Sequence, residues 1–174
     1  TDIFLRAKKK NIQIKVINNT SILNAVGVIG LELYKYGKTT SIVFPDNNWL
    51  PETPYDVIKQ NKSQGLHTLC LLDIKTAEPT KEDILKDKNT AQEPKFMTVN
   101  QAIEVLLKIE DKRKEKIFTK DTFCIGVARI GRDDQKIVSG KASDLLKEDF
   151  GAPLHSLIIP GKLHFVEEEM LENY

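Results

Sequence analysis

The feature that most constrains the fold is the alternation of strand-like and helix-like segments along the chain. Short apolar runs, typical of strands, are separated by stretches in which apolar residues recur at helical spacing. We expect strands at 12–17, 40–44, 66–74, 122–130, 136–138 and 154–159, and helices at 21–36, 54–65, after Thr98, around 145–151 and at 164–173. This alternation predicts an α/β fold.

The segment 21–36 has apolar residues on nearly all sides of the helix that we expect there. Thr20 or Ser21 is a suitable N-cap for it, and Gly37 follows its expected end. A helix that is apolar all round is either interior or shared with a partner, so the pattern predicts a homodimer. A second helix has a sharper signal at its start, because Thr98 and Gln101 stand at capping-box spacing.

The segment from Lys75 to Lys95 differs from the rest of the chain. It has five lysines, five acidic residues and few large apolar ones. Such a segment buries little, so we expect a mobile surface insertion over 75–96.

Charge and residue usage argue against several classes of protein. Lys and Arg number 26 and Asp and Glu 25, so the formal net charge is +1, and there is no basic excess to attract nucleic acid or an anionic membrane. No apolar run approaches the roughly 20 residues that span a bilayer, and no secretory leader opens the sequence, so we expect a cytoplasmic protein.

Cys70 and Cys124 lie in apolar runs and are expected to be buried thiols. The three histidines lack metal-ligand spacing, so we expect no metal site.

Two short segments have the pattern of ligand contacts. In residues 18–22 a strand end meets a helix start, where free N–H groups and hydroxyls suit a carboxylate or phosphate, although a plain N-cap fits as well. Residues 128–131 end a strand, where open α/β sheets bind ligands, although an ordinary exit from the strand fits too. From spacing alone both alternatives stay open.

Longer runs of the sequence resemble the diphthine synthase family, in its eukaryotic form. The runs that carry the resemblance are Asn18–Gly27, Leu31–Gly37, Gly65–Lys75, Met97–Ala102, Val127–Gly131 and Pro153–Ile159. The resemblance extends from Thr1 to the acidic C-terminal segment and is weak only in 75–95. It implies a tetrapyrrole-methylase-like fold, in which a second α/β domain has a mixed sheet flanked by helices.

The resemblance also implies an activity and a site. The family transfers methyl groups from S-adenosyl-L-methionine to the modified histidine of translation elongation factor 2, on the route to diphthamide, and its members pair as homodimers. Cofactor contacts of the family match five residues of this chain: Ser21, Ile22, Leu72, Ile130 and His155. We expect Leu72 and Ile130 to sandwich adenine and His155 to hydrogen-bond the adenosine part. No general base is identified.

The family's glycine-rich loop and its Gly-Asp-Pro segment have no counterpart in this chain. We therefore expect residues 1–19 to be the last helix and strand of a first, cofactor-binding domain and residues 20–174 to be the second domain. We expect such a fragment to be inactive by itself. Two alternatives stay open: a corrin or porphyrin methyltransferase of the same fold, and a non-catalytic dimerisation module.

Overall fold

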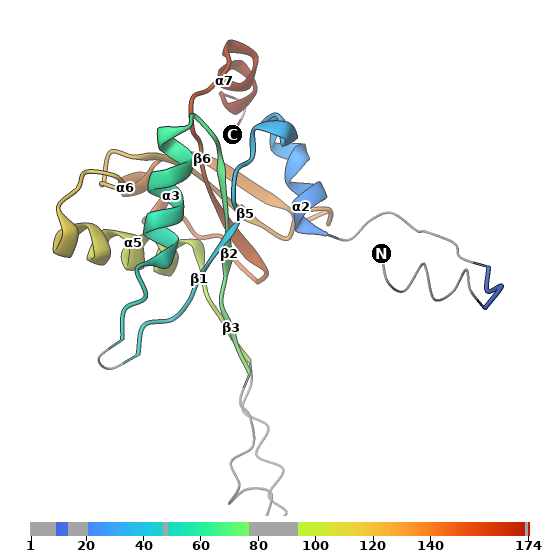
Figure 1. The fold of residues 1–174 in the computed structure, drawn as a ribbon, viewed down its shortest axis with the longest axis horizontal. Helices are drawn as coiled ribbons and strands as arrows, with labels where there is room; N and C mark the ends of the chain where they lie inside the picture. The colour runs from blue at the N-terminus through green and yellow to red at the C-terminus, as the bar shows by residue number, and fades with distance from the viewer. Residues whose placement is uncertain (1–9, 14–20, 47–48, 77–93, 173) are drawn as a thin grey trace, which may run out of the picture.

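The computed structural model describes residues 10–13, 21–46, 49–76, 94–172 and 174. At its centre is a five-stranded sheet in the order β1-β2-β7-β5-β6 (Figure 1). Its strands are β1 (Thr40–Ile42), β2 (Thr68–Leu72), β5 (Phe123–Ala128), β6 (Lys136–Lys141) and β7 (His155–Ile159). Strand β1 pairs with β2 in parallel, and the other pairs are antiparallel. The α/β fold with a mixed sheet is confirmed.

Helices pack on both faces of this sheet. One face is covered by α3 (Thr53–Ser63), α5 (Val99–Arg113) and α6 (Ala142–Leu145), which share its larger apolar core. The other face packs against α2 (Ile22–Ala25), the 3₁₀ turn η1 (Val26–Ile29) and α7 (Phe165–Leu171). In Figure 1, α3, α5 and α6 lie on one side of the sheet and α2 on the other. Because β7 is central, its alternate side chains enter different cores. Leu157 and Ile159 pack in the core with α3, α5 and α6, and Ile158 packs in the core with η1 and α7.

The predicted helix over 21–36 is wrong. Only α2, η1 and a second 3₁₀ turn, η2 (Leu33–Lys35), are helical in that segment. Gly30 ends η1 with φ of 90°, and Glu32 is extended, so the chain bends twice. A side chain at Gly30 would collide with Met170 of α7, so glycine serves both the backbone conformation and the close approach of α7.

Other predictions are confirmed. Thr98 and Gln101 form the capping box that starts α5. Cys70 and Cys124 are buried free thiols, and burial raises the pKa of Cys124 to about 12 and that of Cys70 further.

Parts of several predictions lie outside the described residues. These are most of the first-domain remnant over 1–19, most of the strand over 12–17, residues 18–20 of the ligand-contact segment with the candidate N-cap Thr20, most of the insertion over 75–96, and residue 173 of the last helix. The described ends of the insertion, β3 (Ile74–Lys75) and β4 (Lys95–Phe96), form an antiparallel two-stranded ribbon.

Candidate functional site

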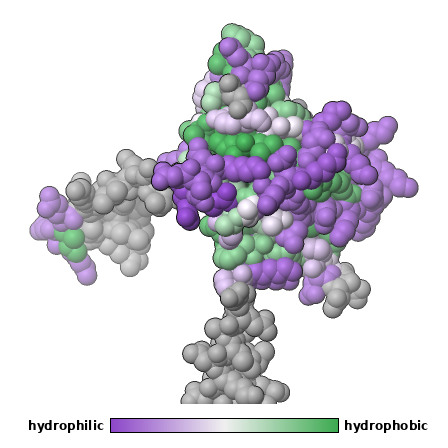
Figure 2. Space-filling model, turned by 180° about the vertical axis from the view of Figure 1, so that it is seen from behind, coloured by the Kyte–Doolittle hydropathy of each residue, from purple (hydrophilic) through white to green (hydrophobic). Residues whose placement is uncertain are grey.

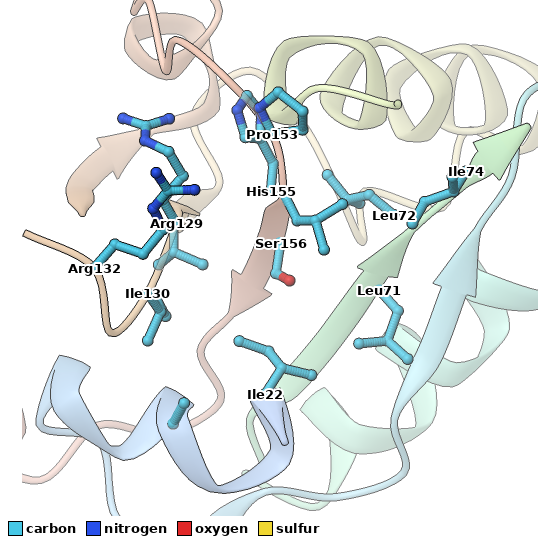
Figure 3. A pocket seen from close by; sticks show the side chains of 13 residues that line it. Ile22, Leu71, Leu72, Ile74, Arg129, Ile130, Arg132, Pro153, His155 and Ser156 are labelled. Atoms are coloured by element: carbon cyan, nitrogen blue, oxygen red, sulfur yellow. The ribbon is translucent and has the colours of Figure 1, made fainter. Parts of the chain in front are cut away.

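A pocket of about 530 Å³ opens where β2 and β5 end and β7 begins. Its walls come from these strand ends, from the start of α2 and from the turns that flank the strands (Figure 3). Because β7 runs antiparallel to both of its neighbours, its first residues lie beside their last ones. The lining residues are mostly aliphatic: Ile22, Ala25, Leu71, Leu72, Ile74, Val127, Ile130, Pro153 and Leu154, with Arg129, Arg132, His155 and Ser156 as the polar ones.

The structure brings four of the five residues predicted from the family resemblance to this one pocket. Ile22, Leu72, Ile130 and His155 all line it, although they come from four different parts of the chain. Ser21 is not among the lining residues. Its hydroxyl caps α2 by accepting a hydrogen bond from the backbone N–H of Leu23, at 3.3 Å. The role of these residues in cofactor binding stays a prediction.

The ring of His155 is hydrogen-bonded to the backbone through both of its nitrogens. Its Nδ1 accepts a hydrogen bond from the backbone N–H of Val99, at 3.4 Å, at the start of α5. Its Nε2 donates to the carbonyl oxygens of Ala152 at 3.0 Å and Gly151 at 3.2 Å. Both ring nitrogens are therefore bonded to backbone groups, through which His155 joins α5 to the 151–152 loop. The hydrogen bond that we expect from His155 to adenosine stays a prediction.

Burial lowers the pKa of His155, so the ring is neutral near pH 7. The tautomer agrees with this, because a protonated Nδ1 would meet the N–H of Val99 instead of accepting from it.

Arg129 lies in the segment 128–131 that the sequence singles out, but its role in holding the pocket together was not predicted. It adopts a left-handed backbone conformation, with φ of 52°, directly after β5. Its guanidinium donates to the carbonyl oxygens of Phe150 at 2.7 Å, Ala152, and Asp134 at 2.9 Å, and pairs with the Asp134 carboxylate at 2.8 Å. Arg129 thus ties the 131–134 turn to the 150–152 loop, and these two segments flank the pocket.

The polar and charged groups of the pocket are unevenly distributed. Arg132 is 69% exposed at the mouth, where its Nε lies 3.2 Å from the Asp134 carboxylate. None of the lining residues is acidic. The inner walls are aliphatic apart from Ser156, the neutral His155 ring and Arg129, whose guanidinium is bonded to the flanking segments. The arrangement suits a ligand with a flat, mostly apolar part inside and an anionic group near the mouth.

In the described part of the chain, no group of three or more His, Cys, Asp or Glu side chains is arranged to hold a metal ion. None of the described helices is long and apolar enough to cross a membrane.

Comparison with known proteins identifies relatives along the whole chain. The diphthine methyl ester synthase of Dictyostelium discoideum is 52% identical over 174 residues, which is 100% of this chain and 64% of the relative. The diphthine synthase of Methanocaldococcus jannaschii is 52% identical over 171 residues, 98% of this chain and 62% of the relative. The chain therefore spans less than two thirds of the length of these curated relatives. No protein-family model matches the chain.

Solved structures agree with these relatives. A crystal structure from Entamoeba histolytica, assigned as a diphthine synthase, matches with a TM-score of 0.82 and 43% identity, over 100% of this chain and 64% of that one. A second crystal structure of a diphthine synthase matches with a TM-score of 0.69 and 30% identity, over 99% of this chain and 59% of that one.

The mixed sheet with its pocket at the strand ends is that of a tetrapyrrole-methylase-like α/β protein, as the family resemblance implied. Within this class the chain is a homologue of the diphthine synthases along its whole length.

Proposed function

We propose that this chain forms part of an S-adenosylmethionine-dependent methyltransferase that modifies a histidine of translation elongation factor 2 on the route to diphthamide. The observation that carries the proposal is the identity of 49–53% to diphthine synthases and diphthine methyl ester synthases over 98–100% of the chain. The relatives argue against a corrin or porphyrin methyltransferase, and the formed pocket argues against a module that only dimerises.

The pocket fits the proposed cofactor. S-adenosylmethionine supplies a methyl group already activated by its sulfonium. The adenine of this cofactor is flat and mostly apolar, and the inner walls formed by Ile22, Leu72 and Ile130 are apolar as well. Its carboxylate is complementary to Arg132 at the mouth. The aliphatic walls exclude water from the base and fix its plane, which contributes to the orientation on which methyl transfer depends.

We propose that the protein acts in the cytoplasm, where elongation factor 2 works. The chain's own balance of charge agrees with a protein substrate, since 26 basic and 25 acidic side chains give no general attraction to nucleic acid.

The proposal is tested by methyl transfer with the complete gene product. Elongation factor 2 carrying the modified but unmethylated histidine is incubated with S-adenosylmethionine, and its mass is measured. We expect a mass increase of whole methyl groups on the elongation factor and none on a corrinoid precursor. No transfer to the elongation factor, by a protein that binds S-adenosylhomocysteine, would contradict the proposed substrate. We expect residues 1–174 alone to be inactive in the same assay.

We also propose a homodimer. Segment 21–36 does not form the one long apolar helix from which we predicted a dimer. It nevertheless exposes apolar side chains: Leu23 is 54%, Leu33 49% and Tyr34 80% exposed. Phe165 and Val166 of α7 are 70% and 52% exposed, and Figure 2 shows hydrophobic surface beside hydrophilic surface toward the end where α7 lies. Light scattering of the complete protein at tens of micromolar is expected to give twice the monomer mass, in low and high salt. A monomer would contradict the proposal.

A further inference from the structure

Ser156 is a polar residue in an otherwise apolar position of the central strand. Side chains alternate between the two faces of β7, and the next residue on the face of Ser156 is Ile158, which lies in the core shared with α7. The residues paired with Ser156 on the two neighbouring strands are Leu71 and Val127, both aliphatic. A β-branched apolar residue would be expected here for packing alone.

The hydroxyl of Ser156 has no hydrogen-bond partner among the described residues, although only 7% of the residue is exposed. The space beside it is the pocket, which Ser156 lines. In Figure 3 its oxygen is directed into the space toward Ile22 and Leu71. The Ser156 oxygen is not among the buried unpartnered atoms of the described residues, so it is accessible from the pocket. A hydroxyl kept in an aliphatic pocket wall, without a partner in the protein, indicates a ligand that completes the bond.

We infer that Ser156 is a nucleoside-binding residue, whose hydroxyl forms a hydrogen bond to the adenosine part of the cofactor. The inference rests on the proposed function. It adds Ser156 as a polar contact beside His155, whose ring nitrogens are bonded in this structure to Val99, Gly151 and Ala152.

The position of Ser156 favours the nucleoside over the amino-acid end of the cofactor. Its neighbours on the adjacent strands, Leu71 and Val127, are aliphatic, which suits a base or a sugar. The guanidinium of Arg129 is already bonded to Phe150, Ala152 and Asp134. The exposed cation, Arg132, lies at the mouth of the pocket instead. A serine hydroxyl both donates and accepts, so it is complementary to a sugar hydroxyl or to the edge of adenine.

The test compares Ser156→Ala, Ser156→Thr and wild type in the complete protein, by calorimetric titration with S-adenosylhomocysteine and with methylthioadenosine, which lacks the amino-acid end. We expect Ser156→Ala to weaken both ligands by a similar factor, about fivefold, as one neutral hydrogen bond is worth. Ser156→Thr, which keeps the hydroxyl, is expected to bind both ligands more tightly than Ser156→Ala.

A structural role is separated by the melting temperature of the ligand-free protein. Removing an unpartnered hydroxyl leaves the melting temperature unchanged or raises it. The control Ser139→Ala, which removes a hydrogen bond from Ser139 Oγ to the carbonyl oxygen of Leu171, lowers it without changing affinity.

Two results would overturn the inference in distinguishable ways. If wild type binds S-adenosylhomocysteine and Ser156→Ala binds it within twofold as tightly, Ser156 makes no such contact while the proposed function stands. If wild type itself binds neither ligand, the proposed function fails and the inference fails with it.

Discussion

Replacing Glu167 by alanine is expected to destabilise the fold by about 3–5 kcal/mol, because it leaves buried polar groups without a partner. Glu167 lies in α7 and is 1% exposed. Its carboxylate accepts hydrogen bonds from the Lys35 ammonium at 2.7 Å, the His67 ring at 3.0 Å, and the backbone N–H groups of Glu32 at 2.9 Å and His164 at 2.7 Å. These bonds join α7 to η2 and to the residue before β2.

The control is Glu168→Ala, one residue along the same helix. Glu168 is exposed, so its replacement is expected to change stability by less than about 1 kcal/mol. Urea unfolding of both variants measures the difference. Equal losses in the two variants would contradict the role of the Glu167 network.

The same network predicts how stability depends on pH. Burial alone would raise the pKa of Glu167, but the hydrogen bonds from Lys35, Glu32, His164 and His67 outweigh it and lower the pKa to about 2. Burial lowers the pKa of His67, whose Nδ1 accepts from the N–H of Gly161 at 3.0 Å and whose Nε2 donates to Glu167.

Both shifts act in the same direction. The unfolded chain binds protons more readily at both groups, so the stability that they contribute is complete above pH 6.5 and falls as the pH decreases. The His67 part falls first, below pH 6.5, and the Glu167 part falls between about pH 4.5 and 2. In Glu167→Ala the part of this loss due to Glu167 is expected to disappear, which unfolding measured at several pH values checks.

The fold was predictable wherever local pattern decides the structure. The capping box at Thr98 needs only its own neighbours to form, and it stands as expected. The apolar run over 66–74 marks a strand, of which the structure forms β2 over Thr68–Leu72. The structure of segment 21–36 was not predictable in this way. Its apolar residues pack against two different elements, the sheet and α7, on either side of the bend at Gly30. A segment that packs in this way has as many apolar residues as a buried helix, so the number of apolar residues does not distinguish the two structures.

The site shows the same limit. The family resemblance led to Ile22, Leu72, Ile130 and His155, which the fold does bring to one pocket. The hydrogen bonds of the His155 ring depend on Val99, 56 residues away along the chain, and no local pattern reveals them. Ser156 did have a signal, since its hydroxyl precedes the apolar run Leu157–Ile159 of the same strand.

Replacing Arg129 by alanine is expected to weaken both the fold and the pocket. The side chain is only 10% exposed, and its guanidinium satisfies the carbonyl oxygens of Phe150, Ala152 and Asp134. Without the guanidinium these carbonyl oxygens lose their hydrogen-bond donor, which lowers the free energy of unfolding by about 2–4 kcal/mol. The left-handed backbone at residue 129 adds to the argument, because in wild type these bonds offset a conformation that non-glycine residues rarely adopt.

The loss at Arg129 also reaches the ligand. Ile130 follows it directly, and the 150–152 loop leads into Pro153, Leu154 and His155, all of which line the pocket. With the turn and the loop no longer tied together, part of the free energy of binding is spent on ordering these walls, and we expect S-adenosylhomocysteine to bind at least about tenfold more weakly to the complete protein.

Arg132→Ala is the control for stability. Arg132 is 69% exposed and pairs with Asp134 at the surface, so its removal is expected to cost less than about 0.5 kcal/mol. Urea unfolding and calorimetric titration measure the two effects. If Arg129→Ala matched wild type in both, the pocket walls would hold their shape without the guanidinium, and the ordering of this site would have to come from the pairing of β5 with β7 alone.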